Sequence, residues 1–461
     1  MCERLVVMNK ENNRVLVLGA AITGIPTARE LYYAGNRVIL NDNKTMEDLK
    51  DTLSPLNGLD IEIITGGHPI DILEKCDYVV ISPGVPTDIP IVSEAKKLGL
   101  EVISEVELAY KHTNTPIAAI TGTNGKTTTT ALLGEIMKES GRSTFVTGNI
   151  GNPIIAEIKN SKPEDIFVLE VSSFQLESTL SFKPKISAIL NITPDHLNRH
   201  KTMENYIDSK CKVFYNQDEN DFTILNKDNL ETAKLQSMPK SKVLMFSRKE
   251  KLNEGAYVED GYLTILLDGE KERVIPIDDI YIPGNHNLEN ALAASLMAYC
   301  LGVNPNVISK VLKEFKGVEH RIEFVCEIDG VAYYNDSKGT NSDSSIKALE
   351  SMKRPIVLIA GGMDKGTDFY DFIKCFEGKV KSLVLLGETA EKIEKQAREL
   401  NFDKIYRVTD LEKAVYKARE LAETGYAVLL SPACASWDMF KSFEERGRLF
   451  KSIVRRLRGA D

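Results

Sequence analysis

Residues 118–133 read AAITGTNGKTTTTALL, in which an apolar strand pattern runs into a glycine-rich turn and then into a helical pattern. Backbone N–H groups of such a turn, together with the N-terminus of the following helix, bind phosphate oxygens. We expect the Lys126 side chain to reach the terminal phosphates of a nucleotide and the Thr127 hydroxyl to coordinate Mg²⁺. The general phosphate-loop pattern has glycine where this chain has Ile120, so the loop is a variant. A strand–turn–helix connection without a ligand is the alternative.

Carboxylate and imidazole side chains follow the next apolar strand patterns. Glu170 lies near the end of IFVLEV, and an acid at the end of a strand beside a phosphate loop can hold Mg²⁺ directly or through water. The segment NITPDHLNRH, at 191–200, places His196 and His200 four residues apart. A zinc helix of the H-E-x-x-H type is excluded, because Leu197 stands where that pattern needs an acid. For Glu170 the alternative is a solvated acid at a strand end.

A second glycine turn lies near the start of the chain. Residues 19–24, GAAITG, follow a strand pattern and open a helical one, and Asp42 ends the next strand pattern. This arrangement is close to the dinucleotide fingerprint G-x-G-x-x-G with its later acid, but Ala21 stands at the second glycine. The turn gives weak support to a nucleotide-like ligand. A dehydrogenase and a plain strand-to-helix turn both stay open.

These motifs need strands that alternate with helices, and the chain has that pattern almost throughout. Apolar, β-branched runs predict an α/β fold with strands at 14–19, 36–40, 78–84, 100–104, 115–122, 166–171 and 186–193. Residues 221–283 change to short strands and turns, which indicates a small, partly antiparallel sheet appended to a mostly parallel one. A helix is expected over 284–299, and a third series of strands begins after 317.

Length suggests three domains, since a chain of 461 residues exceeds the size of one hydrophobic core. We expect a Rossmann-like N-terminal domain over 1–112 and a central domain like a P-loop ATPase over 113–317, which holds the mostly parallel sheet and the small antiparallel one. A Rossmann-like C-terminal domain is expected over 318–461.

Composition excludes several classes of function. The chain has 58 Lys and Arg against 67 Asp and Glu, a formal charge of −9, which argues against a dedicated nucleic-acid binder. Its seven cysteines form no C-x-x-C pair, so neither a zinc ribbon nor a disulfide framework is indicated. We see no signal-peptide pattern and no apolar run near the roughly 20 residues that span a bilayer. The expectation is a cytoplasmic monomer with no nucleic-acid or membrane partner.

Several motifs are long enough to compare with known families. Together they resemble the Mur ligase family over nearly the whole chain: ITGTNGKTT, GNIG, VLEVSSFQLE, NITPDHLNRH, GNHNLENALAA, HRIEFV, YYNDSKGTN and LLSPACASWDMFKSFEERG. The resemblance implies a domain for the UDP end of a substrate, a central ATPase and a C-terminal domain for an amino acid. The segments VSSFQLE and SPACASWDMF are similar to the corresponding segments of one family member. That member joins D-glutamate to UDP-N-acetylmuramoyl-L-alanine in cytoplasmic peptidoglycan precursor synthesis.

The resemblance also implies roles for single residues around ATP and the metal. Lys126, His196 and Lys210 would be catalytic. Thr127 and Glu170 would hold one Mg²⁺, and His196 and Lys210 a second, with Lys210 carbamylated by CO₂. A helical lysine is otherwise a solvated surface residue, but carbamylation makes it an anion that can face a metal. The implied ATP-binding set is Gly122, Thr123, Asn124, Gly125, Lys126, Thr127, Thr128, Asn287, Asn290, Arg321, Asp336 and Lys338.

Two further sets are implied for the other substrates. The set for the UDP-linked substrate is Thr23, Asp42, Asn43, Asn149, Ser172, Ser173 and Gln175. The set for D-glutamate is Thr340, Lys365, Ser436 and Phe443. Lys365 would pair with the side-chain carboxylate, because an anionic substrate needs a cation in an acidic protein.

The implied reaction is ATP-dependent amide formation. The alanyl carboxylate would attack the γ-phosphate of ATP to give an acyl phosphate, and the amine of D-glutamate would then displace phosphate. The alternatives are another amide ligase of the superfamily, such as a folylpolyglutamate synthase, a nucleotide-binding regulator without turnover, and the dehydrogenase raised above.

Overall fold

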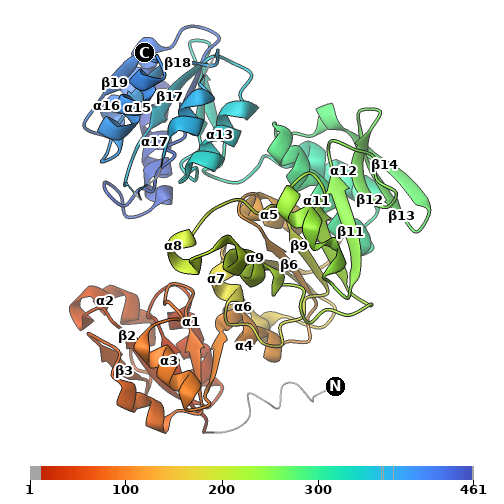
Figure 1. The fold of residues 1–461 in the computed structure, drawn as a ribbon, viewed down its shortest axis with the longest axis vertical. Coiled ribbons are helices and arrows are strands. Elements are labelled where there is room, and N and C mark those ends of the chain that lie inside the picture. Colours follow the sequence, from red (N-terminus) through yellow and green to blue (C-terminus); the bar gives the residue numbers. More distant parts are fainter. Residues whose placement is uncertain (1–11, 365, 367, 377, 459–461) are drawn as a thin grey trace. The chain divides into compact units, whose positions relative to one another are not determined.

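Three β-sheets organise the chain in a computed structural model that describes residues 12–364, 366, 368–376 and 378–458 (Figure 1). The sheets have five, nine and six strands, in the orders β3-β2-β1-β4-β5, β14-β13-β12-β11-β10-β9-β6-β8-β7 and β15-β16-β20-β17-β18-β19. The predicted α/β class with three sheet-based parts is confirmed. Contacts divide the chain into two units: one runs to Tyr281 and resumes over Glu289–Phe315, and the other holds Ile282–Leu288 and the chain from Lys316. The boundary expected near residue 112 therefore stays a prediction.

The N-terminal sheet is parallel throughout. Its two faces are both covered, since Val15 and Val17 of β1 pack in one core while Leu16 and Leu18 pack in another. The sequence pattern did not reveal β3, which is short and only half-buried. The strands are β1 Arg14–Leu18, β2 Arg37–Asp42, β3 Glu62–Thr65, β4 Tyr78–Ile81 and β5 Glu101–Ser104; the helices are α1 Gly24–Tyr33, α2 Met46–Leu53, α3 Pro90–Lys97 and α4 Glu105–Lys111.

The central sheet is parallel from β7 to β12 and antiparallel from β12 to β14, so the predicted antiparallel strands continue the edge of this same sheet. Its strands are β6 Ile117–Thr121, β7 Thr144–Gly148, β8 Ile166–Glu170, β9 Ile186–Ile189, β10 Phe222–Asn226, β11 Lys242–Ser247, β12 Gly255–Glu259, β13 Tyr262–Leu267 and β14 Glu270–Pro276. Its helices are α5 Lys126–Glu139, α6 Ile154–Glu157, α7 Ser173–Leu176, α8 Leu197–His200, α9 Met203–Cys211, α10 Leu230–Ala233, α11 Asn285–Cys300 and α12 Pro305–Glu314.

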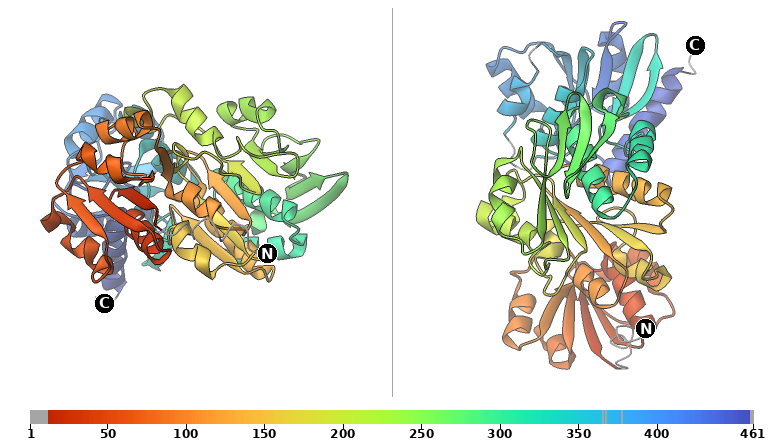
Figure 2. Two further views of the ribbon diagram at one scale, coloured as in Figure 1. Left: turned by 90° about the horizontal axis from the view of Figure 1, so that it is seen from below. Right: turned by 90° about the vertical axis from the view of Figure 1, so that its right-hand side faces the viewer.

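The C-terminal sheet is parallel except for its edge strand β15, which pairs antiparallel with β16. Alternate residues of β17 again pack on opposite faces, which helices cover (Figure 2). The strands are β15 Glu323–Ile328, β16 Val331–Asn335, β17 Ile356–Ala360, β18 Val380–Leu385, β19 Ile405–Arg407 and β20 Ala427–Leu430; the helices are α13 Ser342–Ser351, α14 Tyr370–Lys374, α15 Ala390–Glu399, α16 Leu411–Leu421 and α17 Phe443–Arg458. Among the described residues, no helix is both long and apolar enough to span a membrane.

Candidate active site

Four polar segments of the central sheet lie at the carboxyl ends of its parallel strands. Strands β7, β8, β6 and β9 are parallel neighbours, so the segments that follow them meet at their carboxyl ends. The phosphate loop bonds the segment after β9: the N–H of Thr123 donates to Asn191 O at 2.9 Å, and the N–H of Asn124 to Asn191 Oδ1 at 2.8 Å. Asn149, after β7, donates its side-chain amide to Glu170 Oε1 at 3.0 Å. The phosphate loop, the strand-end acid and the segment that carries His196 are therefore neighbours.

Two glycines shape the phosphate loop. Gly122 has a φ of 147° and Gly125, the N-cap of α5, has a φ of 86°, which is the left-handed region that favours glycine. A Cβ on Gly125 would lie 2.4 Å from Asn290 Oδ1, so a larger residue would displace that side chain. Ile120, which stands where the general pattern has its first glycine, lies fully buried within β6. The tight turn starts only after the strand.

Lys126 folds back over this loop. Its ammonium donates to the carbonyls of Gly122 and Thr123, both at 3.0 Å, and so lies next to the backbone that would surround phosphate oxygens. Thr127 and Thr128 follow in the first turn of α5 and are both buried. Among the described residues, the Thr128 hydroxyl has no hydrogen-bond partner.

Glu170 provides the test of whether the carboxyl end of this sheet fits a metal ion. Its side chain is 1% exposed, and only Oε1 is bonded, to Asn149. Oε2 is buried and has no hydrogen-bond partner among the residues that the structure describes. A buried carboxylate oxygen without a partner is costly unless a cation or donor binds it. Since Mg²⁺ prefers oxygen ligands, the Glu170 carboxylate fits such an ion.

Lys210 lies on α9, as predicted, but it is not a surface residue. The side chain is 1% exposed, and its Nζ donates to Gly122 O at 2.8 Å and lies 4.5 Å from the centre of the Tyr206 ring. Burial, followed by repulsion from Lys126, holds the pKa of Lys210 well below its usual value. The neutral amine is therefore favoured beside the phosphate loop.

His196 and His200 differ sharply in environment, which their spacing did not reveal. His196 is the N-cap of α8, with a φ of 54° and a side chain 47% exposed. His200 is buried, and its Nδ1 and Nε2 lie 3.2 Å from Glu177 Oε1 and 3.0 Å from Ser173 Oγ. Burial lowers the pKa of His200 to about 4, so this ring is neutral and structural.

The residues implied for the muramoyl end already have local partners. Ser172 and Gln175 form a capping box at the start of α7: the Gln175 N–H donates to Ser172 Oγ at 3.3 Å, and the Ser172 N–H to Gln175 Oε1 at 2.9 Å. Ser173 bonds His200, and Asn149 bonds Glu170. Each of these side chains is therefore held in place by a neighbouring residue.

In the N-terminal sheet, Asp42 holds the first glycine turn together. Its Oδ2 accepts from the N–H of Ala20 at 2.7 Å and its Oδ1 from the N–H of Lys44 at 2.9 Å. Thr23 is the half-buried N-cap of α1, and Asn43 is exposed. The structure thus groups the three residues implied for the UDP end around the carboxyl ends of β1 and β2.

The C-terminal unit gathers a second polar group around Asp336. This residue is 3% exposed, and it accepts from Ser431 Oγ at 2.7 Å and from the N–H of Ile322 at 3.2 Å. Burial raises the pKa of Asp336 to about 6, although the charge of Arg321 acts in the opposite direction. The Nε of Arg321 is buried without a hydrogen-bond partner among the described residues. Asn287, in the same unit, donates to Pro283 O at 2.7 Å.

The residues implied for D-glutamate lie after neighbouring strands of the C-terminal sheet. Thr340 follows β16, and Ser436 and Phe443 follow β20. The Lys338 ammonium lies 5.4 Å from the centre of the Phe443 ring. Lys365 falls outside the described residues, so its role stays a prediction.

Sequence reasoning missed Arg446, which ties these two loops together. It is 2% exposed, and its guanidinium donates to Ser337 O at 2.8 Å, to Ser337 Oγ at 3.0 Å and to Cys434 O at 3.2 Å. A charged residue on an inward-facing position of the last helix was the available signal. Arg446 holds the loop after β16 against the loop after β20.

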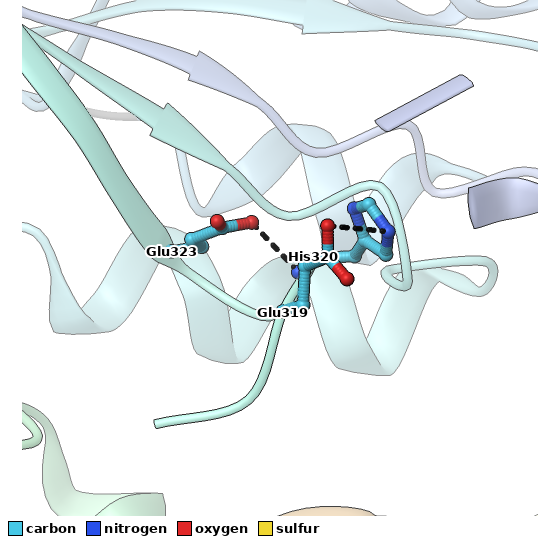
Figure 3. A group of neighbouring side chains, drawn as sticks. All are labelled: Glu319, His320 and Glu323. Carbon is cyan, nitrogen blue, oxygen red and sulfur yellow. Dashed lines mark hydrogen bonds and ion pairs between the residues drawn. The ribbon is translucent and has the colours of Figure 1, made fainter. Parts of the chain in front are cut away.

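A cluster of possible metal ligands also lies in this unit. Glu319, His320 and Glu323 approach one another closely, and the His320 N–H donates to Glu323 Oε2 at 2.9 Å (Figure 3). The Lys451 ammonium lies 2.6 Å from Glu319 Oε1 and 2.9 Å from Glu323 Oε1. Because a cation of the chain already neutralises these carboxylates, we assign no metal to them.

The fold and the site together define a class of protein. Family profiles described as Mur ligase MurD-like N-terminal domain, Mur ligase middle domain, and Mur ligase glutamate ligase domain match residues 13–104, 120–298 and 320–434. The chain belongs to the Mur ligase family. It is 53% identical to the UDP-N-acetylmuramoylalanine–D-glutamate ligase of Thermoanaerobacter pseudethanolicus, over 98% of this chain and 100% of that protein. The ligase of the same name from Clostridioides difficile is 50% identical, with the same coverage.

Solved structures of more distant members share the fold. UDP-N-acetylmuramate-alanine ligase MurC from Thermotoga maritima aligns with a TM-score of 0.61 and 20% identity, covering 97% of this chain and 100% of that one. MurF from Acinetobacter baumannii aligns with a TM-score of 0.62 and 15% identity, covering 98% of both chains. At these identities the likeness concerns the fold alone.

Proposed function

We propose that the chain joins D-glutamate to UDP-N-acetylmuramoyl-L-alanine in peptidoglycan precursor synthesis, with cleavage of ATP to ADP and phosphate through an acyl phosphate. The proposal rests on the groups that lie together at the carboxyl ends of the parallel strands in the central sheet. There a phosphate loop, a lysine and a buried carboxylate, one oxygen of which has no partner in the described part of the chain, adjoin the segment that carries His196. Relatives at about half identity over their full length carry the name of this activity.

Different residues of the site serve different parts of the first half-reaction. The N–H groups of the loop and the start of α5 bind the phosphates of ATP, and Lys126 neutralises charge that spreads over the transferring phosphoryl group. Thr127 and Glu170 would hold Mg²⁺, which would supply further neutralisation of the charge on the transferring phosphoryl group. The alanyl carboxylate attacks the γ-phosphorus, and ADP leaves.

The second half-reaction uses the C-terminal unit. Thr340, Lys365, Ser436 and Phe443 bind D-glutamate, and Lys365 pairs with its side-chain carboxylate. The amine of D-glutamate attacks the carbonyl carbon of the acyl phosphate, the C–O bond to phosphate breaks, and the amine loses a proton as the amide forms. Arg321, Asp336 and Lys338, with Asn287 and Asn290, contact the nucleotide.

We further propose that Lys210 is carbamylated and serves, with His196, a second Mg²⁺. Burial favours the neutral amine, which is the form that adds to CO₂, and the side chain lies against the phosphate loop. Carbamylation turns this neutral nitrogen into an anionic carbamate, which the nearby Lys126 ammonium attracts. Lys210→Ala should therefore abolish turnover, and short carboxylates should restore part of it. Full activity of this variant would contradict the role.

The test of the reaction is phosphate release with ATP, Mg²⁺ and UDP-N-acetylmuramoyl-L-alanine, with each glutamate enantiomer supplied in turn. Phosphate release that requires D-glutamate, together with a UDP-linked dipeptide product identified by mass, supports the proposal. Release with a folate and L-glutamate instead would indicate the folylpolyglutamate synthase type of ligase. We propose that the enzyme acts as a monomer in the cytoplasm, with no nucleic-acid partner.

A further inference from the structure

The guanidinium of Arg199, on α8, connects two segments that lie far apart in the sequence. Nη1 donates to Pro83 O at 2.6 Å, and Nη2 donates to Val85 O at 3.2 Å. Nη2 also lies 2.7 Å from Glu177 Oε2, and the arginine side chain is only 16% exposed. Arg199 thus bonds the loop after β4 of the N-terminal sheet to the segment after β8 of the central sheet.

The loop after β4 packs directly against the first glycine turn. Ser82 Oγ donates to Gly19 O at 3.1 Å, and a Cβ on Gly19 would lie 3.0 Å from Val85 Cγ2. The two carbonyls that Arg199 holds therefore belong to the wall of the turn proposed for the UDP end of the substrate.

On its other side, Arg199 contacts the ring beside His196. The Arg199 Cζ lies 4.2 Å from the centre of the Phe174 ring, and the centres of the Phe174 and His196 rings are 4.9 Å apart. A cation over an aromatic face at this distance is attracted to the ring. The helices α7 and α8, which carry this group or are capped by it, both contact α9 (Figure 1).

The short helix α8 needs such an anchor. It is bounded by two residues other than glycine with left-handed backbone, His196 at a φ of 54° and Lys201 at a φ of 70°. Such backbone conformations are strained in residues other than glycine and persist only where the surroundings hold them. Arg199 of this helix forms an ion pair with Glu177, and Nδ1 of the neighbouring His200 lies 3.2 Å from Glu177 Oε1, so both contacts fix α8 on the segment after β8.

We propose that Arg199 is a positioning residue that sets the distance between the UDP-binding turn and the His196 segment. The inference rests on the proposed function. The planar guanidinium donates in fixed directions to two carbonyls and one carboxylate at once, which the single ammonium of a lysine cannot reproduce. In this way the alanyl carboxylate of a bound UDP-linked substrate is presented to the phosphate loop.

The test compares Arg199→Ala and Arg199→Lys with a matched control, Arg142→Ala. Arg142 also donates to two backbone carbonyls, Glu164 O at 3.1 Å and Asp165 O at 3.3 Å, but it follows α5 at the opposite end of β8. Dissociation constants for UDP-N-acetylmuramoyl-L-alanine and for ADP are measured by calorimetry, together with kcat for phosphate release. Thermal unfolding of each variant reports on stability.

We expect Arg199→Ala to weaken binding of the UDP-linked substrate about tenfold and to lower kcat by about a hundredfold, while ADP binding changes less than about twofold. Arg199→Lys should recover a small part of the loss, and added guanidinium at non-denaturing concentration should partly restore Arg199→Ala. Arg142→Ala should lower the unfolding temperature without a difference between its effect on binding of the UDP-linked substrate and its effect on binding of ADP.

Equal weakening of both ligands, the same kinetic loss in Arg142→Ala, or no rescue by guanidinium would overturn the role of Arg199. If Arg199→Ala does not fold, the same comparison is made with Arg199→Lys, for which an unchanged substrate affinity and kcat would overturn it. Absence of D-glutamate-dependent phosphate release by the parent chain would instead contradict the proposed function itself.

Discussion

Glu170 and Lys210 are both about 1% exposed, yet their polar atoms are satisfied in different ways. Lys210 donates to a carbonyl of the phosphate loop, whereas Glu170 keeps one oxygen without a partner among the described residues. A protein built for stability alone would pair such an atom or replace it with an apolar one. At the residue scale, the Glu170 oxygen that has no partner among the described residues is the atom to which we propose that Mg²⁺ binds.

Glu170→Gln should therefore separate stability from activity. The glutamine still accepts from Asn149, and the variant no longer buries a charge, so its unfolding temperature without ligands should be equal to or above that of the parent. Phosphate release should fall at least about a hundredfold, and the Mg²⁺ concentration for half-maximal rate should rise. Thermal unfolding and a Mg²⁺ titration of the rate measure the two effects. A clear loss of stability would assign Glu170 a structural role instead.

At the scale of the element, α4 shows how one helix joins the N-terminal and central sheets through two buried acids. Glu107 accepts from the N–H groups of Leu180, Ser181 and Phe182, each at 2.9 Å. Glu105 accepts only from the N–H of Ile155, at 2.8 Å, and its Oε2 is buried without a partner among the described residues. Burial raises the pKa of Glu105 to about 7.

This difference predicts a pH dependence of stability. Below about pH 4.5 Glu105 is protonated in both states. As the pH rises to about 7, the unfolded chain releases this proton while the folded chain retains it, so the free energy of unfolding falls. The neutral Glu105→Gln variant lacks this loss, and its stability relative to the parent should grow by up to about 3 kcal/mol between pH 4.5 and 7.5. Denaturant unfolding at a series of pH values measures it.

Glu107→Gln is the matched comparison on the same helix. Because its carboxylate is fully bonded to backbone amides, this substitution should lower the free energy of unfolding by about 2 kcal/mol at neutral pH. If Glu105→Gln also destabilised the chain at pH 7.5, the unpartnered oxygen would not be the source of the pH effect.

At the scale of the whole molecule, the hydrophobic cores do not correspond one to one with the three sheets. One hydrophobic cluster contains Val17 and Ile103 of the first sheet together with Ile117 and Phe167 of the central sheet. The clusters of the C-terminal sheet draw on neither of these two sheets. Cooperative unfolding follows shared burial, so the first two sheets should unfold as one body.

Calorimetry of the full chain should accordingly resolve two transitions. Phe450→Ala removes a fully buried ring from a C-terminal core and should cost about 3–5 kcal/mol. It should lower the temperature of one transition and leave the other in place. Three transitions in the parent chain, or a shift of both by this substitution, would contradict the division into two units.

Local sequence patterns predicted much of this fold and of its candidate site. The strand before the phosphate loop, the helix that begins at Lys126 and the strand that ends at Glu170 all follow from apolar periodicity and turn chemistry. The strand β3 was missed because its residues are half-buried and give a weak pattern. The burial of Lys210 was not predictable from its helix, since its surroundings come from the distant phosphate loop.

The sequence by itself determined the α/β class, the order of the elements, the family and the residues with reactive groups, because these depend on periodicity and on motifs close together in the chain. The tertiary structure decided which of those groups are paired. Within the described residues it left one Glu170 oxygen without a partner, neutralised Glu319 and Glu323 with Lys451, and set Arg199 between two sheets. Burial and pairing depend on contacts between residues far apart in sequence, so only the folded chain specifies them.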